Sequence, residues 1–206
     1  MTPFIVGIGG TLRERSYSRA ALNIALQIAQ RQGAEVELLD LRALDLPMYV
    51  PDLLIEDYPA NRVAAVTRLM QTARRAQALI WSSPTYHGTV SGVFKNALDM
   101  LELLGDDDPP YLSGKAVGLI AVSDSQTFSA MASSVHELRG WLAPTYLTLD
   151  SQDFNPDLSL KPGPATRRAE RLVGELLEFV AYRTQSPILS RSRKPRPSTS
   201  WRARCA

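Results

Sequence analysis

Cysteine and histidine are nearly missing from this sequence of 206 residues. The chain has one cysteine, Cys205, and two histidines, His87 and His136. A single cysteine excludes an internal disulfide and a cysteine-based metal cluster. Two histidines give equally little support to a histidine-rich metal site. We therefore expect no metal centre in this protein.

Long apolar runs are also missing. No segment approaches the ~20 apolar residues that a membrane-spanning helix needs. The first residues, Met1-Thr2-Pro3, provide no basic region ahead of the first apolar run, so the sequence indicates no secretory signal. Hydrophobic residues make up 45% and charged residues 21%, the balance of a globular protein. We expect a cytoplasmic protein with no membrane partner.

The net charge of +2 hides an uneven distribution. Residues 187–206 contain six basic residues and no acidic ones, whereas residues 1–186 carry 17 basic groups against all 21 acidic groups, a net charge of −4. Because its body is mildly acidic, nucleic acid is not an expected partner of the body. We predict one domain over residues 1–185 and a basic, disordered tail over residues 186–206. A basic arm for an anionic surface is the alternative for the tail.

Strand-like and helical segments alternate along the body. Apolar runs predict strands at Phe4–Gly9, Val36–Leu39, Ala78–Ser82, Ala116–Val122 and near Thr145–Leu149. Apolar residues at helical spacing predict helices at Arg19–Gln32, Ala60–Ala76, Val93–Leu104, around Ser129–Trp141 and at Ala165–Arg183. The prolines between Asp40 and Asp57 predict a long loop there. This alternation predicts an α/β protein, a three-layer sandwich around a parallel sheet.

Ligands of such sheets bind outside the carboxyl ends of the strands, near the point where the strand order reverses. The loop after the first strand contains glycines, the hydroxyls of Thr11, Ser16 and Ser18, and the guanidinium of Arg13. These groups, together with the N-terminus of the next helix, suit a phosphate dianion. An ordinary capped turn with surface arginines would fit the same residues. A Walker lysine and a G-x-G-x-x-G pattern are both absent, which disfavours triphosphate hydrolysis and a dinucleotide site.

The loop after the third strand is stiff and presents an aromatic ring. Its Pro84-Thr85-Tyr86-His87-Gly88 segment exposes backbone amides beside Tyr86, an arrangement that suits a flat heteroaromatic ligand. Ser91 is placed to cap the following helix. A packing role for Tyr86 and a solvated loop position for His87 are the alternatives. A lone histidine does not define a general base.

Both loops belong to longer patterns. The first is Gly10-Thr11-Leu12-Arg13-x-x-Ser16-x-Ser18, and the second runs without interruption from Ser83 to Asp99. Together they resemble the NAD(P)H-dependent FMN reductase family, which includes flavin, quinone, azo-dye and chromate reductases. The resemblance covers roughly residues 4–183. It implies a flavodoxin-like fold with a five-stranded sheet in the order 2-1-3-4-5, and a homodimer or homotetramer.

The resemblance also implies a cofactor site. Thr11, Arg13, Ser16 and Ser18 would hold the FMN phosphate, and Pro84, Thr85, Tyr86, His87 and Gly88 would line the ribityl chain and the isoalloxazine. Ser123, after the fourth strand, would border the ring. The family often has a glycine-rich loop at that position, whereas Ser123–Phe128 contains no glycine.

The activity implied by the resemblance is hydride transfer from NADPH or NADH to FMN and then to a small acceptor, in a ping-pong sequence. The acceptor could be a quinone, a free flavin, an azo compound or a metal oxyanion. No side-chain acid or base is required for the hydride step, so no catalytic side chain is expected. A flavodoxin-type electron carrier and an interaction protein without reductase activity are the alternatives. A phosphatase-like protein is disfavoured, because the first strand ends in glycines rather than carboxylates.

Overall fold

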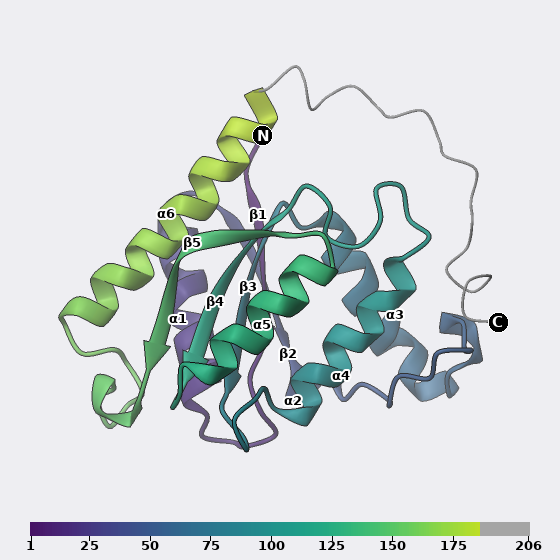
Figure 1. Ribbon diagram of the computed structural model, residues 1–206, viewed down its shortest axis with the longest axis horizontal. Coiled ribbons are helices and arrows are strands. Elements are labelled where there is room, and N and C mark those ends of the chain that lie inside the picture. The colour runs from purple at the N-terminus through teal and green to yellow at the C-terminus, as the bar shows by residue number, and fades with distance from the viewer. Residues whose placement is uncertain (186–206) are drawn as a thin grey trace.

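Five parallel strands form the centre of the computed structural model, which describes residues 1–185 (Figure 1). Their order across the sheet is β2-β1-β3-β4-β5. The strands are β1 (Phe4–Gly9), β2 (Glu35–Asp40), β3 (Ala78–Pro84), β4 (Ala116–Val122) and β5 (Trp141–Leu149). The predicted fold class and strand order are therefore confirmed. The basic tail predicted over residues 186–206 lies outside the described residues.

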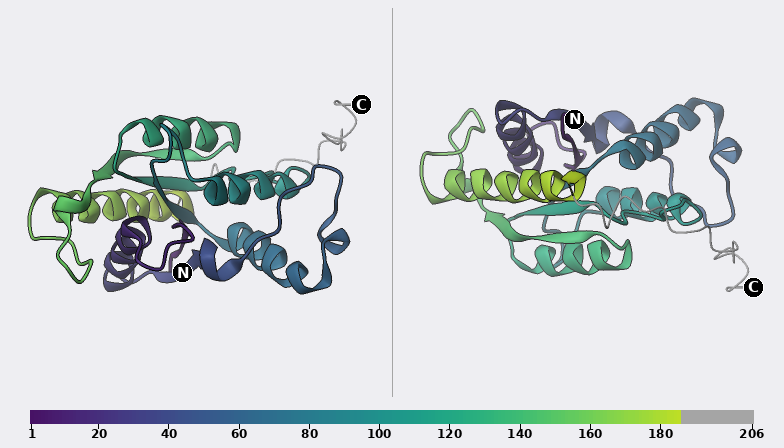
Figure 2. Two further views of the ribbon diagram at one scale, coloured as in Figure 1. Left: turned by 90° about the horizontal axis from the view of Figure 1, so that it is seen from below. Right: turned by 90° about the horizontal axis from the view of Figure 1, so that it is seen from above.

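Helices cover both faces of the sheet (Figures 1 and 2). They are α1 (Tyr17–Arg31), α2 (Leu41–Leu44), α3 (Ala60–Arg75), α4 (Gly92–Met100), α5 (Gln126–Glu137) and α6 (Pro164–Gln185). α1 and α6 bury one apolar core against the sheet, and α3, α4 and α5 bury another on the opposite face. No helix within residues 1–185 combines the length and the apolar content that crossing a membrane demands.

The central strands are β1, β3 and β4, and every one of their residues is buried. Such strands are mostly apolar on both faces, which explains their apolar runs. The exceptions are Ser82 and Ser83 at the end of β3, whose hydroxyls make hydrogen bonds. The edge strand β2 instead carries three acidic residues, each paired with an arginine: Glu35 with Arg75, Glu37 with Arg68 and Asp40 with Arg19. Charged side chains of this kind discourage pairing of an edge strand with another chain.

Two helices begin earlier than their apolar periodicity indicates. α1 begins at Tyr17 because Ser16 is its N-cap and accepts a hydrogen bond from the Arg19 amide at 3.2 Å. Ser18 therefore lies in the first helical turn. α5 begins at Gln126, three residues before the prediction, and Asp124 accepts the Gln126 amide at 3.0 Å.

The predicted helical end at Trp141 is wrong. α5 ends at Glu137, and the chain turns through Arg139, whose φ is 61°, and Gly140, whose amide donates to the Val135 carbonyl at 2.9 Å. Trp141 is instead the first residue of β5. Its side chain is 59% exposed, whereas the apolar side chains of α4 are mostly buried in the chain's own core.

The predicted loop at Asp40–Asp57 contains two short elements, α2 and a 3₁₀ turn at Ile55–Asp57. The Asp40 side chain caps α2 by accepting from the Arg42 amide at 3.1 Å. The middle of the segment is held by Asn96 of α4, which accepts from the Tyr49 amide and donates to the Pro47 carbonyl, both at 2.8 Å. A side chain from a distant helix thus replaces the secondary structure that the prolines prevent.

Candidate functional site

Three loops meet at the carboxyl edge of the sheet, below β1, β3 and β4 in Figure 1. They connect β1 to α1, β3 to α4 and β4 to α5. Because these strands are neighbours in the middle of the sheet, the predicted cofactor residues come together at one edge.

The first loop leaves β1 in close contact with β3. A Cβ atom on Gly9 would lie 2.2 Å from the Ser82 carbonyl oxygen, so no other residue fits there without a shift of backbone. Gly10 has a φ of 98°, and its amide donates to the same carbonyl at 3.1 Å. The Ser82 hydroxyl in turn donates to the Ser18 carbonyl at 2.9 Å. The loop and the start of α1 are therefore fixed to β3.

The three predicted hydroxyls are buried in this loop and in the first turn of α1. Thr11, Ser16 and Ser18 are 4%, 4% and 1% exposed. The hydroxyls of Ser16 and Ser18 are hydrogen-bonded to each other at 3.0 Å, and Thr11 accepts from the Arg13 amide at 2.9 Å. Buried hydroxyls beside a helix N-terminus form a polar environment in which an anion can replace lost water.

Arg13 differs from the other arginines around this loop. Arg19 is paired with Asp40 at 3.2 Å, and Arg15 donates to the Pro156 carbonyl. Within residues 1–185, the exposed guanidinium of Arg13 has neither a hydrogen bond nor a carboxylate partner. Among the described residues, the Arg13 guanidinium is therefore the positive charge of this loop that is available to bind an anionic ligand.

Backbone amides complete the donor set. In the described part of the chain, the amides of residues 14–16 have no acceptor. The amides of Tyr17 and Ser18 open α1 and have no carbonyl to bind within the helix. Free amides at a helix N-terminus, buried hydroxyls and one uncommitted guanidinium fit a phosphate dianion. The residues present therefore suit the phosphate of FMN.

The second loop contains a tight two-residue hairpin. The Tyr86 amide donates to the Thr89 carbonyl at 2.9 Å, and the Thr89 amide donates back to the Tyr86 carbonyl at 3.2 Å. The central residues His87 and Gly88 have φ values of 52° and 79°, the left-handed pattern that such turns need. The prediction that the Pro84–Gly88 segment exposes its backbone amides is therefore wrong for Tyr86 and for Thr85, whose amide donates to the Val122 carbonyl at 2.8 Å. The amides of His87 and Gly88 have no acceptor in the described part of the chain.

The second and third loops are tied together by threonines. The Thr85 hydroxyl lies 2.7 Å from that of Thr127, and one of the two donates to the other. The Asp124 carbonyl lies 3.2 Å from the Thr85 hydroxyl and the Thr89 carbonyl lies 3.2 Å from the Thr127 hydroxyl, and the hydroxyl hydrogen that is not used between the threonines is available to one of these carbonyls. The Thr85 side chain is thus engaged within the protein, and the surface presented by this loop is made by its backbone and by exposed side chains, among them those of His87 and of the 39% exposed Tyr86.

Two residues of this arrangement were not among the predicted site residues. Gln126 places its side-chain oxygen 2.8 Å from where a Cβ on Gly88 would lie, and Thr127 joins the two loops. Only the earlier start of α5 brings these residues to the sheet edge. Asp124, whose side chain accepts the Gln126 amide just ahead of the Ser125 N-cap, is the sequence signal that could have revealed them.

The third loop has a glycine-like conformation without a glycine. Ser123 has a φ of 90°, and its amide donates to the Leu149 carbonyl at 2.8 Å. A non-glycine residue in this region carries backbone strain. The loop keeps a turn that glycine would normally provide.

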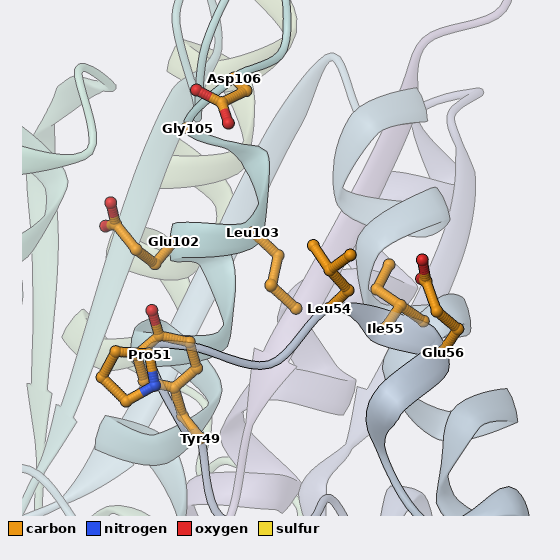
Figure 3. A pocket seen from close by; sticks show the side chains of 9 residues that line it. All are labelled: Tyr49, Pro51, Leu54, Ile55, Glu56, Glu102, Leu103, Gly105 and Asp106. Carbon is orange, nitrogen blue, oxygen red and sulfur yellow. The ribbon is translucent and has the colours of Figure 1, made fainter. Parts of the chain in front are cut away.

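A cavity of about 290 Å³ lies elsewhere (Figure 3). The β2–α3 connection contributes Tyr49, Pro51 and Leu54, and the chain after α4 contributes Glu102 and Leu103. None of the predicted cofactor residues lines it. The candidate cofactor site is therefore the loop surface at the sheet edge rather than this cavity.

The fold and the loops define a flavodoxin-like α/β protein with an anion cradle beside an exposed aromatic loop. Residues 3–152 match the model of the family described as NADPH-dependent FMN reductase. The chain belongs to this family, and the predicted resemblance is confirmed. The expected oxidoreductase activity, with FMN and a reduced nicotinamide, agrees with the description of the family.

Curated relatives share this description. The chain is 30% identical over 179 residues to the NADPH-dependent FMN reductase ArsH of Shigella flexneri, covering 84% of this chain and 66% of the relative. It is 32% identical over 128 residues to an NAD(P)H-dependent FMN reductase of Pseudomonas aeruginosa, covering 62% and 64%. The chain thus spans just under two thirds of these two relatives. An FMN-dependent NADPH-azoreductase of Staphylococcus aureus is 29% identical, covering 83% and 92%.

Solved structures show the same fold. The flavoenzyme NAD(P)H:acceptor oxidoreductase FerB of Paracoccus denitrificans superimposes with a TM-score of 0.66 at 20% identity, covering 88% of this chain and 97% of FerB. The apo form of the NADH:FMN oxidoreductase EMOB gives a TM-score of 0.64 at 19% identity, covering 95% and 98%. A flavodoxin from Bacillus cereus gives 0.53 at 14% identity, covering 85% and 97%.

Proposed function

We propose that this chain is an NAD(P)H-dependent FMN oxidoreductase that passes electrons to a small acceptor in a ping-pong sequence. The observation that carries the proposal is the first loop, in which buried hydroxyls, free amides and the uncommitted Arg13 form an anion cradle. Family membership supports the activity. Quinones, free flavins, azo compounds and metal oxyanions are the acceptor classes to test.

The chain's own residues bind and orient the cofactor in this proposal. Thr11, Arg13, Ser16 and Ser18 would hold the phosphate. The hairpin at Tyr86–Thr89 would present its ring and the amides of His87 and Gly88 to the flavin, and Ser123 would border the ring. FMN, when bound, supplies the hydride chemistry, so no side-chain acid or base is needed. The threonine links between the second and third loops keep this surface in place.

Substitution of Arg13 tests the cradle. Arg13→Ala removes a charge-assisted contact worth roughly 1.5–3 kcal/mol, so we expect the Kd for FMN to rise about 10-fold to 150-fold. Arg15→Ala is the matched control, because Arg15 lies in the same loop and its guanidinium is engaged by Pro156. Quenching of FMN fluorescence measures both affinities. Equal affinities of the two variants would contradict the phosphate assignment.

Reaction with NADPH tests the enzyme. Anaerobic addition of NADPH to the FMN-loaded protein should bleach the flavin absorbance. A flavodoxin-type carrier would bind FMN without bleaching, and an interaction protein that has lost the site would not bind FMN. Varying NADPH and the acceptor together should then give the parallel reciprocal plots of a ping-pong sequence.

We also propose that the chain forms a homodimer or homotetramer. Trp141 and Leu142, at the start of the edge strand β5, are 59% and 41% exposed. Neighbouring apolar side chains on an edge strand are typical of surfaces that another subunit covers. Light scattering over a dilution series checks the assembly, and a monomer at every concentration contradicts it.

A further inference from the structure

A second cavity lies at the opposite edge of the sheet, where β3 and β4 begin. Its volume is about 200 Å³, and Gln77, Lys115, Phe179 and Arg183 are among the residues that line it. A water molecule in the liquid takes up about 30 Å³, so the cavity has room for a small hydrated ion. No residue of the three cofactor loops lines it, so an inference about it does not depend on the proposed function.

Lys115 brings a largely buried cation to this cavity. Its ammonium donates to the Ala76 carbonyl at 2.6 Å and to the Arg74 carbonyl at 2.8 Å, both at the C-terminal end of α3. An ammonium has three N–H donors, and within residues 1–185 the third has no acceptor. Burial lowers the pKa of Lys115 to about 8, with Asp107 opposing this effect and Arg183 adding to it.

The carboxylate near Lys115 is already committed. Asp107 accepts two hydrogen bonds from the Arg74 guanidinium, at 2.7 and 3.1 Å. That pair is internally neutral, so it leaves the charge of Lys115 largely unbalanced.

Arg183 brings a second cation without a carboxylate. Its guanidinium lies against the turn that precedes β4, where a Cβ on Gly114 would be 2.6 Å from the terminal nitrogen Nη2. It also lies 5.9 Å from the centre of the Phe179 ring. Among the described residues, no acidic side chain forms an ion pair with Arg183 or Lys115. Two cations that repel each other therefore share one cavity.

We propose that this cavity binds a small oxyanion, a phosphate ion or a phosphate monoester, between the ammonium of Lys115 and the guanidinium of Arg183. The remaining N–H of Lys115 and the planar fork of Arg183 are donors that suit phosphate oxygens. The hydroxyl of Ser113, which lines the same cavity and has no partner within residues 1–185, adds a third donor. An anion held there balances both positive charges.

Titration with inorganic phosphate tests this site. Saturating FMN is kept present so that the first loop is occupied, and the pKa of Lys115 is followed by NMR of its ε-methylene carbon. An opposite charge within about 4–6 Å favours the ammonium form, so phosphate should raise this pKa by about one unit. A second titration, with phenyl phosphate, distinguishes a phosphate monoester from the free phosphate ion as the ligand. The same rise indicates a site for monoesters, and a rise with inorganic phosphate alone indicates a site for the free ion.

Arg183→Gln is the decisive variant, because within residues 1–185 Arg183 makes no hydrogen bond whose loss would unfold the protein. It should weaken phosphate binding about tenfold or more. Arg171→Gln, on the exposed surface of the same helix, should leave the affinity unchanged. The proposal is overturned if phosphate does not move the Lys115 pKa, or if the Arg183 and Arg171 variants bind phosphate equally well. The test compares the effect of phosphate on the Lys115 pKa in these two variants. Its outcome therefore does not depend on whether the protein binds FMN.

Discussion

Replacing Ser123 by glycine should stabilise the protein. Ser123 has a φ of 90°, a conformation that costs a non-glycine residue about 1–2 kcal/mol. Glycine removes that strain but adds roughly 0.4–1 kcal/mol of conformational freedom to the unfolded chain. The Ser123 amide, which donates to the Leu149 carbonyl, is kept in the variant. The net expectation is a gain of about 1 kcal/mol.

Thermal unfolding is the assay for this variant. For a domain of this size, 1 kcal/mol corresponds to a rise in Tm of about 2–4 °C. Ser125→Gly is the matched control, because Ser125 lies two residues further along the same loop with an ordinary φ of −69°. Without strain to relieve, the control should lower Tm slightly. If Ser123→Gly lowers Tm as much as the control does, the strain assigned to Ser123 does not exist.

Two further changes test the stability of the rest of the fold. Glu175 accepts both the amide and the hydroxyl of Thr145, at 2.8 and 2.6 Å, where the pairing of β4 with β5 shifts register. Glu175→Ala should lower the free energy of unfolding by about 1.5–3 kcal/mol in denaturant titrations. Glu175→Gln should lower it by less than half of that, because the glutamine oxygen still accepts one of the two hydrogen bonds and its NH₂ group donates to the Thr145 hydroxyl oxygen. Equal losses would contradict this. Burial lowers the pKa of Lys115 from 10.5 to about 8. Between pH 8 and 10.5 the folded protein therefore binds fewer protons than the unfolded chain. The free energy of unfolding should rise with pH over this range. The free energy of unfolding, measured at pH 7.5 and 9.5, should show this rise in the wild type but not in Lys115→Met. The raised pKa of Tyr111, about 12, lowers stability with rising pH only above about pH 10, outside this range. An identical pH dependence of the two proteins would refute it.

The central part of the fold could be predicted from the sequence because burial on both faces leaves little choice of residue. Ala116–Val122 is an apolar run whose limits coincide with those of β4. Polar residues would leave unpaired groups in such a strand, so the ends of the run mark the ends of the element. The sheet order followed from the resemblance, and the structure confirms it.

Element ends that depend on local conformation could not be predicted in this way. α5 begins at Gln126, whose amide the Asp124 side chain accepts, and ends at Glu137, two residues before Arg139 takes a φ of 61°. Neither feature changes the apolar periodicity, so the expected helix was displaced toward Trp141. The 59% exposed indole of Trp141 belongs to an edge strand, where a large apolar side chain gives no sign of helix or strand.

The candidate site shows a related limit. The loops and their residues followed from the sequence, but which groups remain free for a ligand did not. Thr85 is engaged by Thr127, which is 42 positions away in the chain, and the Tyr86 amide is engaged by Thr89. Such pairings depend on how two loops approach one another, and this distance is set by the neighbouring strands β3 and β4. Within residues 1–185 the Arg13 guanidinium has no partner, whereas those of Arg15 and Arg19 are engaged by Pro156 and Asp40.

These pairings explain how a chain with two histidines and one cysteine can present a candidate cofactor site. Most donors at the sheet edge are backbone amides, which are available at any residue except proline once the backbone is held in the right conformation. Holding it requires Gly9 to pass within contact of the Ser82 carbonyl and the hairpin tip at Gly88 to pass beneath Gln126. The side chains of the second and third loops mainly fix the backbone, and Arg13 adds charge. What the sequence must specify at this site is therefore chiefly conformation rather than reactive chemistry.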